Sequence, residues 1–440
     1  MQHSHEALDR PGGLSAVNLF SPLRHRDFRL LWAGMTVSLL GDGIFLVAIA
    51  WESYVLWNAP AALSIVGIGM TVPMILFLLP GGVVTDRLDR RRVMLCADAV
   101  RAAAVGALTA LALAGALRFW ELVALVAVYG VGTAFFTPAF DAIVPDLVLG
   151  RDLAAANSLD QFVRPIALRL AGPALGGGLV AAGAGVAFLV DAVSFGASAL
   201  AILAMRPLGR PREGGAESGF AALVAGLRFV RRRVWLWGTL LSAALAYLAF
   251  LGPTEVLLPY VVKNDLHGSA RALGLVFAAG GVGAVGAALA MGQRGHPRRD
   301  VTFIYVVWTL ATLAVAGYGF ASATWQLGLA CLLFNALEAA GTIVWATLKQ
   351  RHVPASMLGR VSSLDWLISI GLLPLSFALT APVAAALGAR ATLVGAAAIG
   401  GAITLGALFL PGMRDVEGAA EEAEGEPEPL GSVAASGAGI

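Results

Sequence analysis

The sequence predicts an all-α membrane protein with twelve transmembrane helices in two six-helix halves. Its 440 residues are 58% hydrophobic and only 13% charged, whereas about 25% of the residues in a typical soluble domain are charged. Apolar runs long enough to cross a hydrocarbon layer of about 30 Å, which takes about 20 helical residues, recur along the chain. Corresponding sequences also recur six runs apart. A soluble protein of this length would need polar surface that the chain lacks.

Twelve apolar runs are interrupted by short polar or charged segments. The predicted spans lie near 29–51, 62–84, 93–116, 120–144, 154–182, 184–205, 236–262, 270–293, 301–320, 324–348, 358–387 and 390–410.

The remaining segments divide the chain. A cytoplasmic N-terminal segment (1–27) precedes the first half (28–205). A cytoplasmic linker (206–234) follows, in which Phe220, Leu223, Leu227 and Val230 share one face of a predicted interfacial amphipathic helix; a plain linker is the alternative. The second half (235–411) leads into a glutamate-rich tail (412–440), which we expect to be disordered.

Arginine and lysine concentrate on one side of this predicted topology. With both termini inside, the outer loops hold only Arg118, Lys263, Arg271 and Arg390, and the inner loops hold most of the others. Positive residues favour the cytoplasmic side of short loops. We therefore predict both termini in the cytoplasm.

Lysine is nearly absent while arginine is abundant. This composition indicates a bacterial protein with a GC-rich genome, and for a bacterial protein with these spans we predict an inner-membrane location.

A densely charged loop joins the second and third predicted spans. It reads Gly82-Val83-Val84-Thr85-Asp86-Arg87-Leu88-Asp89-Arg90-Arg91-Arg92. The pattern Gly-x-x-x-Asp-Arg-x-x-Arg-Arg resembles the corresponding loop of the major facilitator superfamily, except that Asp89 stands where that family usually has glycine. The resemblance implies conformational or gating roles for Gly82, Asp86, Arg87, Arg90 and Arg91.

An internal repeat relates the two halves. Val144-Pro145, Leu149-Gly150-Arg151 and Ser158-Leu159-Asp160 lead into the fifth span, and Val353-Pro354, Leu358-Gly359-Arg360 and Ser363-Leu364-Asp365 lead into the eleventh. Corresponding loops six spans apart indicate halves related in parallel, as in major facilitator transporters.

Further motifs refine the resemblance. Phe28-Arg29-Leu30-Leu31-Trp32 with Ser38-Leu39-Leu40-Gly41-Asp42 is similar to the start of the branch that holds macrolide-efflux proteins and the enterobactin exporter. Gly172-Pro173-Ala174-Leu175-Gly176-Gly177 resembles the glycine-proline motif of the superfamily's antiporters, although Leu168 replaces an upstream glycine. The resemblance implies a conformational role for Gly172, Pro173, Gly176 and Gly177. Close packing of a small-xxx-small helix face is the alternative.

Ionisable residues inside the spans are the candidates for coupling and substrate contact, because such residues are costly in a membrane and usually functional. Asp42 and Glu338 fall near mid-membrane, at 1.5 Å of rise per helical residue. Arg164 is a third candidate, for which an i,i+4 pair with Asp160 is an equal alternative. The fourth candidate, Glu255, falls toward an outer end. For Glu338, a hydrogen bond to Asn335 is the structural alternative.

Other intramembrane charges have simpler interpretations. Asp98 and Arg101 are three residues apart and should pair locally in a conformational role. Asp191, like Glu255, lies toward an outer end, where a side chain can reach water. Asp141 and Asp365 lie toward the cytoplasmic end, where roles at helix ends or in gating are expected.

Several chemistries lack support in the sequence. No nucleotide-binding P-loop occurs, because neither lysine follows a glycine. Gly281-x-Gly283-x-x-Gly286 matches the dinucleotide-binding pattern, but it lies within a predicted span and indicates helix packing. No histidine falls inside a span, so a proton would have to be carried by a carboxylate. Cys96 and Cys331 are interpreted as buried, unpaired thiols. We expect no metal, no cofactor and no enzymatic activity.

The sequence thus predicts a monomeric, proton-coupled exporter of amphipathic small molecules such as drugs or siderophore-like compounds. Its partners would be the substrate, protons and the lipid bilayer, and not nucleic acid. An importer or uniporter of a small solute is an alternative. A non-transporting membrane sensor or scaffold on the same fold is another.

Overall fold

The computed structural model describes residues 20–148, 150–206, 226–294 and 297–417, and all regular structure within these ranges is helical. Twelve helical segments of this described part are long and apolar enough to cross a membrane, which confirms the predicted fold class. The predicted linker residues Phe220 and Leu223, and the tail beyond Glu417, lie outside the described residues.

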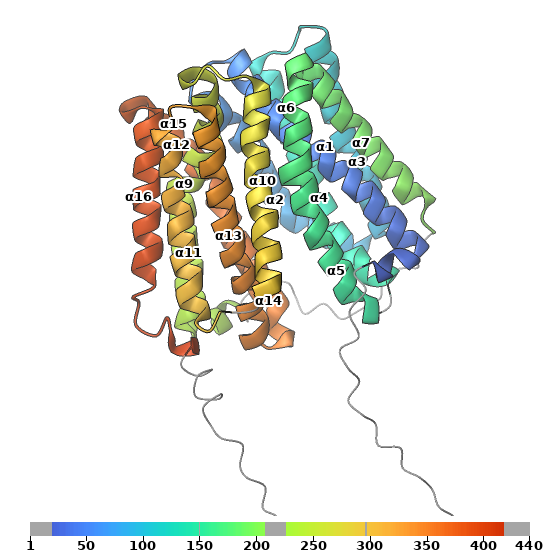
Figure 1. Ribbon diagram of the computed structural model, residues 1–440. Helices are drawn as coiled ribbons and strands as arrows, with labels where there is room; N and C mark the ends of the chain where they lie inside the picture. The colour runs from blue at the N-terminus through green and yellow to red at the C-terminus, as the bar shows by residue number, and fades with distance from the viewer. Residues whose placement is uncertain (1–19, 149, 207–225, 295–296, 418–440) are drawn as a thin grey trace, which may run out of the picture.

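The first half contains six spans, followed by six in the second (Figure 1). The elements of the first half are α1 (Arg26–Leu56), α2 (Ala61–Arg87), α3 (Arg90–Leu113), α4 (Phe119–Leu147), α5 (Gly150–Arg164), η2 (Pro165–Ala171), α6 (Gly172–Ala182) and α7 (Ala184–Ala204), after a short 3-10 turn η1 (Ser21–Arg24). Those of the second half are α9 (Val234–Tyr260), η3 (Val261–Asp265), α10 (Ala270–Arg294), α11 (Asp300–Ala314), α12 (Ala316–Phe320), α13 (Thr324–His352), α14 (Ala355–Gly371), α15 (Leu373–Leu387) and α16 (Ala389–Ala407).

The fifth span is interrupted where the sequence places a proline. Pro165 has no backbone N–H to donate and disturbs the α-helical ladder, and the chain continues as the π-helix η2 before α6 resumes regular geometry. Such π-helical turns often occur at functional sites. The interruption lies between α1 of the same half and α10 of the other half.

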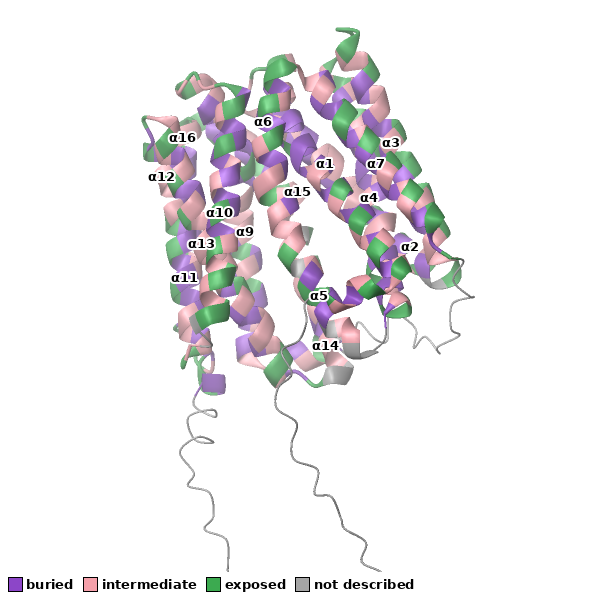
Figure 2. Cartoon of the chain, turned by 45° about the vertical axis from the view of Figure 1, so that its right-hand side comes forward, coloured by how far each residue is buried: buried purple, intermediate pink, exposed green. Residues whose placement is uncertain are grey.

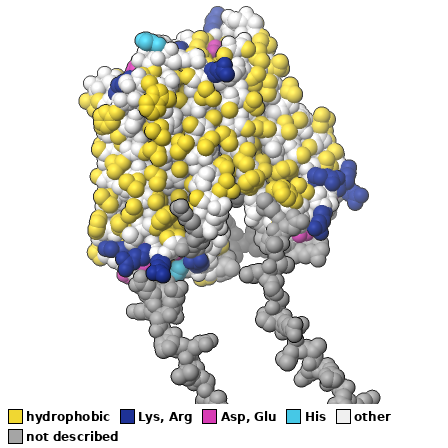
Figure 3. All heavy atoms as spheres, viewed as in Figure 1, with side chains coloured by type: hydrophobic (Ala, Val, Ile, Leu, Met, Phe, Trp, Pro, Cys, Tyr) yellow, Lys and Arg dark blue, Asp and Glu magenta, His cyan; other side chains and the backbone are white. Residues whose placement is uncertain are grey.

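The outward faces of the helices are apolar. Leu76, Leu79, Leu200 and Leu387 are 65–75% exposed, and hydrophobic side chains cover the flank of the molecule between its two ends (Figure 3). Buried residues instead face neighbouring helices (Figure 2). A soluble surface rarely carries so much contiguous apolar area, and such a flank is typical of a helical membrane protein. Cys96 belongs to the exposed residues; its predicted burial is wrong, because its side of α3 has no helix packed over it, whereas Cys331 is buried.

The two ends of the bundle differ in charge. We call the end that holds the α2–α3 loop the arginine-rich end, and the other, where Trp57 and Lys263 lie, the opposite end. Lys and Arg side chains gather along the lower edge in Figure 3, which is the arginine-rich end. The first and last described residues also lie at this end (Figure 1), as an even number of spans requires.

The described chain extends past the boundary predicted at residue 412. The Glu417 carboxylate accepts hydrogen bonds from Thr302 N (2.6 Å) and Thr302 Oγ1 (3.0 Å). Thr302 lies in the first turn of α11, where free backbone N–H groups favour an anion. Residues 412–417 are therefore held against α11, a long-range contact that composition does not reveal.

Glycines allow the helices to approach closely. A Cβ atom added to Gly281 would lie 2.4 Å from Arg169 O, and one added to Gly283 would lie 2.2 Å from Leu332 O. The prediction that this glycine-rich stretch serves helix packing is confirmed for these two positions. At Gly286 such an atom would meet nothing within 4 Å.

Candidate functional site

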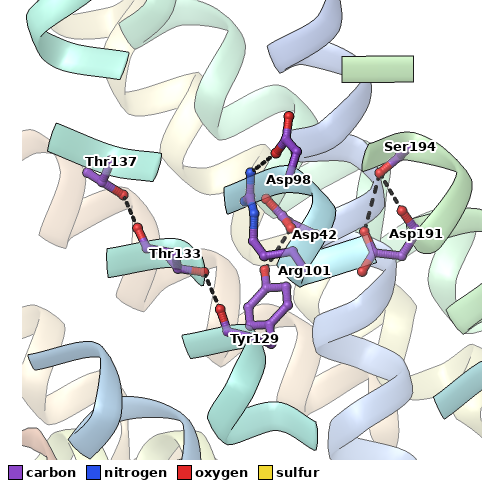
Figure 4. A network of polar contacts seen from close by, with 8 residues as sticks. All are labelled: Asp42, Asp98, Arg101, Tyr129, Thr133, Thr137, Asp191 and Ser194. Carbon is purple, nitrogen blue, oxygen red and sulfur yellow. Dashed lines mark hydrogen bonds and ion pairs between the residues drawn. The ribbon is translucent and has the colours of Figure 1, made fainter. Parts of the chain in front are cut away.

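An ionic cluster lies among four helices of the first half (Figure 4). Its members are Asp42 on α1, Asp98 and Arg101 on α3, Tyr129 on α4, and Asp191 and Ser194 on α7. Arg101 forms an ion pair with Asp98, and Tyr129 Oη donates a hydrogen bond of 2.7 Å to Asp42 Oδ1. Asp98, Arg101 and Asp191 are buried, whereas Asp42 retains partial exposure.

The guanidinium group of Arg101 is enclosed by aromatic rings. Its Cζ atom lies 4.2 Å from the ring centre of Phe136 and 4.5 Å from that of Phe195, distances at which a cation is attracted to the ring face. Gly132 makes room for this side chain, because a Cβ atom there would lie 2.6 Å from Arg101 Cγ. The sequence thus supplies a fixed, desolvated positive charge in the middle of the half.

Gly41 likewise makes room for the carboxylate of Asp191 on α7. A Cβ atom on Gly41 would lie 2.5 Å from Asp191 Oδ1 and 2.2 Å from Ser194 Oγ. Asp191 therefore sits directly against α1, beside Asp42. Its predicted access to water at an outer end is wrong, because its side of α7 packs on α1 and leaves it fully buried.

The cluster contains three carboxylates and one guanidinium group. Asp98 Oδ2, Asp191 Oδ2 and Arg101 Nε are buried and have no hydrogen-bond partner among the described residues. The predicted local pair of Asp98 with Arg101 is present, but its surroundings make it part of a larger network. Unpaired negative charge away from water costs several kcal/mol per ion, so this arrangement favours the uptake of positive charge.

A central cavity of about 600 Å³ lies between the two halves. Aliphatic and aromatic side chains from both halves form most of its lining, among them Leu46, Ile49, Met70, Phe250 and Phe377. The charged residues in its lining, within the part of the chain that the structure describes, are Arg169, Glu255 and Glu338. Cavities of roughly 300–1,000 Å³ with a mainly apolar lining and a few polar groups are typical of small-molecule sites.

Glu255 and Glu338 are thus brought together in one cavity, although they lie 83 positions apart in sequence. Glu255 is exposed, and its side chain lines this cavity. Glu338 accepts a hydrogen bond of 3.0 Å from Thr342 Oγ1. The expected partner of Glu338, Asn335, instead donates to Cys331 O at 2.9 Å.

Arg169 is a site residue that the motif-based prediction misses. It lies on the π-helix η2 and donates a hydrogen bond of 3.1 Å from its guanidinium group to Asn335 Oδ1, across the boundary between the halves. Its position as an arginine inside an apolar span is the signal that identifies it.

Arg164 lies outside the central cavity and pairs with Asp160 at 3.3 Å, which is the local alternative considered for it. Asp160 also lines a separate cavity of about 240 Å³ with Trp32, Asp141 and Asn157. In the second half, Asp365 pairs with Lys349 and accepts a hydrogen bond of 2.9 Å from Trp345 Nε1. Both repeated Ser-Leu-Asp sequences therefore place their aspartates in ion pairs.

Contacts between the halves close the cavity toward the opposite end. Tyr54 Oη donates a hydrogen bond of 2.6 Å to Val256 O, and Lys263 Nζ donates to Tyr54 O. Farther out, Asn58 Nδ2 donates to Asn264 Oδ1 at 2.8 Å. These residues lie beyond Ala50, which lines the cavity on the same side of α1.

The charged segment 82–92, predicted as a loop, is mostly helical: residues 82–87 belong to α2 and residues 90–92 to α3, so only Leu88 and Asp89 connect the two helices. Arg90 forms an ion pair with Asp146 and donates to Ala142 O at 2.9 Å, both on α4. Arg91 donates to Ile202 O at 2.8 Å and to Leu203 O at 2.5 Å, which are carbonyl groups at the end of α7. Cations are favoured at such helix C-termini. Arg90 and Arg91, in the first turn of α3, therefore hold α3 against α4 and α7. The Asp86 side chain lies outside what the structure describes.

The glycine-proline stretch packs α6 against both halves. A Cβ atom on Gly172 would lie 2.7 Å from Gly43 Cα, and one on Gly176 would lie 3.0 Å from Ile44 Cα, both on α1. On Gly177 it would lie 2.9 Å from Gly274 Cα of α10 in the second half. The expected close packing is present, and it places this stretch at the contact between halves.

Comparison with known proteins agrees with this architecture. A family model described as transmembrane secretion effector matches residues 17–433. The chain belongs to this family of major facilitator transporters. It is therefore a transporter and not an enzyme.

Two curated relatives and two solved structures extend the comparison. The chain is 29% identical over 362 residues to the enterobactin exporter EntS of Citrobacter koseri, which covers 79% of this transporter and 83% of EntS. It is 30% identical over 406 residues to the multidrug efflux pump Tap of Mycolicibacterium fortuitum, with 88% and 96% covered. A bacterial homologue of the iron transporter ferroportin aligns with a TM-score of 0.64 at 17% identity, over 87% of this chain and 99% of that one. A bacterial homologue of the lysosomal transporter Spinster aligns with a TM-score of 0.61 at 15% identity, over 93% and 99%. These two structures support the fold alone.

Proposed function

We propose that this transporter exports amphipathic small molecules by proton-coupled antiport. The central cavity carries the proposal: it is mainly apolar, holds three charged side chains among its described lining residues, and lies between the two halves. A cavity with few polar groups accepts varied amphipathic molecules, since apolar contact is non-directional. Both curated relatives named above are exporters, which supports export over import.

The ionic cluster is the proposed proton site. Asp42 is its partly exposed carboxylate, adjacent to two further carboxylates and one guanidinium group. Binding of a proton there would lower the excess negative charge of the cluster, and release would restore it. Because α1 also lines the cavity through Leu46, the same helix carries the proton site and part of the substrate site.

In this proposal, the structure represents the state in which the central cavity is closed toward the outside of the cell. We propose that the arginine-rich end faces the cytoplasm of a bacterial inner membrane, in keeping with the positive-inside tendency. Both termini and the linker 206–234 would then be cytoplasmic. Rocking of the halves about the central cavity would break the contacts at Tyr54 and Asn58 and expose the substrate to the outside.

Inside-out membrane vesicles test the proposal. A panel of fluorescent amphipathic compounds should accumulate in vesicles that contain the transporter when the vesicle interior is acidified, and collapse of the proton gradient should abolish the accumulation. Vesicles without the transporter are the control. Accumulation that survives the collapse would exclude proton coupling. Gradient-driven depletion of the compounds would indicate an importer, and equilibration alone would indicate a uniporter.

A further inference from the structure

We infer that the central cavity selects organic cations, with Glu255 as the carboxylate that holds the positive charge. This inference rests on the proposed function and names the chemical class of its substrate. It is carried by the state of Glu255, whose exposed side chain lines the cavity and has no described residue within hydrogen-bond or ion-pair distance; its electrostatic interaction with Arg169 acts over a longer distance. An ionised carboxylate inside a membrane protein usually has a partner, and here a bound ligand can supply it.

The other charged groups of the cavity already have protein partners. Arg169 donates to Asn335 Oδ1 at 3.1 Å, and Glu338 accepts from Thr342 Oγ1 at 3.0 Å. With both carboxylates ionised, the three charged side chains sum to one net negative charge. The cavity therefore attracts a cation and repels an anion, and its low-dielectric surroundings strengthen both effects.

Glu255 lies on the cavity-facing side of α9. Tyr247, Leu251 and Leu258 line the same cavity from this helix, at the three- and four-residue steps that place side chains on one helical face. Glu255 thus projects from a rigid helix into the space where a substrate would lie.

Aromatic rings beside this face strengthen the preference for cations. The ring centres of Tyr247 and Phe250 are 5.7 Å apart, and those of Phe250 and Phe334 are 6.0 Å apart, so the three rings form a continuous wall of the cavity. The faces of aromatic rings attract organic cations, especially where water is excluded. A bulky cation can contact this wall while its charge is neutralised by Glu255.

The test uses two probes of the same shape and opposite charge. Binding of tetraphenylphosphonium and of tetraphenylborate is measured by equilibrium dialysis on the purified full-length transporter in detergent. We expect tetraphenylphosphonium to bind and tetraphenylborate to bind at least about tenfold more weakly, as a charge reversal beside one carboxylate implies. Tighter binding of tetraphenylborate would overturn the inference without any substitution.

Variants then test whether Glu255 is the carboxylate that binds the cation. Glu255→Gln should weaken tetraphenylphosphonium binding about tenfold, and Glu255→Asp should restore part of it. Glu52→Gln, which removes a carboxylate outside the cavity, is the matched control and should leave binding unchanged. Arg169→Gln should leave cation binding equal or tighter. Equal binding by Glu255→Gln and the unmodified transporter, or loss of cation binding in Arg169→Gln with Glu255 intact, would overturn the assignment.

Binding in detergent needs neither a gradient nor movement of the halves. A transporter that binds the cation but fails to move it with a proton gradient would refute the proposed antiport and leave the inference standing. Gradient-driven export of neutral compounds by a transporter that binds neither probe would refute the inference about organic cations and leave the proposed antiport standing.

Discussion

The hydroxyl group of Tyr129 donates a hydrogen bond of 2.7 Å to Asp42 Oδ1 and so joins α4 to α1 within the first half. Four positions along α1 from Asp42, Leu46 lines the central cavity. A change in the charge of Asp42 therefore occurs about one helical turn from the substrate site. The proposed proton site and the central cavity share α1 but not their lining residues. Helix α1 is therefore a candidate for coupling protonation of Asp42 to substrate binding.

Asp42→Asn should abolish gradient-driven efflux and spare passive downhill flux. The amide of asparagine cannot take up and release a proton, yet it keeps the size of the side chain and can still accept the hydrogen bond from Tyr129. Efflux with and without an imposed proton gradient measures the difference. Tyr129→Phe, which removes only the donor, should reduce but not abolish gradient-driven efflux.

Glu338→Gln provides the comparison, because Glu338 is the second mid-membrane carboxylate predicted as a proton carrier. If it is the carrier, this variant should lose gradient-driven efflux in the same way. Survival of gradient-driven efflux in both single variants and in the double variant would remove both carboxylates from the proton path.

Gly172→Ala should destabilise the transporter by about 1–3 kcal/mol, the usual cost of overpacking. The added methyl group would lie 2.7 Å from Gly43 Cα and 2.9 Å from Leu40 O, both in α1, so the backbones of two helices would have to separate. Thermal unfolding in detergent measures the loss. Gly178→Ala on the same helix is the matched control: nothing lies within 4 Å of its added atom, and the midpoint should be unchanged or slightly higher, since alanine favours the helix. Equal effects at both positions would exclude close packing as the reason for Gly172.

Asp86→Asn should lower transport while expression and substrate binding stay nearly intact. The family resemblance of the charged segment 82–92 implies a conformational role for Asp86, and Arg90 of the same segment, at the start of α3, contacts α4. Arg90→Gln should therefore have a similar effect on transport. Arg92→Gln is the control, because the Arg92 side chain is 84% exposed and lies 3.8 Å from its partner Asp89. A proportional fall in binding and transport for Asp86→Asn would place the residue in the substrate site instead.

Cysteine labelling should place the arginine-rich end in the cytoplasm. The background for this experiment lacks Cys96 and Cys331, because Cys96 is exposed and could react. A reagent that does not cross the membrane, added outside, should modify the Asn58→Cys variant and spare Gly214→Cys and Pro297→Cys. Asn58 lies in the exposed loop at the opposite end. Labelling at 214 and 297 with protection at 58 would reverse the proposed orientation.

Sequence alone was sufficient for properties that depend on consecutive residues. The twelve spans follow from runs of apolar residues, and each lies within a few residues of its predicted position. The Asp98–Arg101 and Asp160–Arg164 pairs are likewise present, because residues three or four apart meet on a helix whatever its surroundings are.

Only the tertiary structure decided which intramembrane charges meet. Asp191 and Glu255 both lie toward a predicted outer end, yet packing buries Asp191 against α1 and turns Glu255 into the central cavity. Arg169 acquires its role from the π-helix after Pro165 and from a partner on the other half. Hydropathy cannot reveal such relationships, because a spanning helix is apolar toward lipid as well as toward its neighbours. The rotation of each helix is set by close packing at glycines such as Gly41 and Gly172, and that packing depends on residues far away in the sequence.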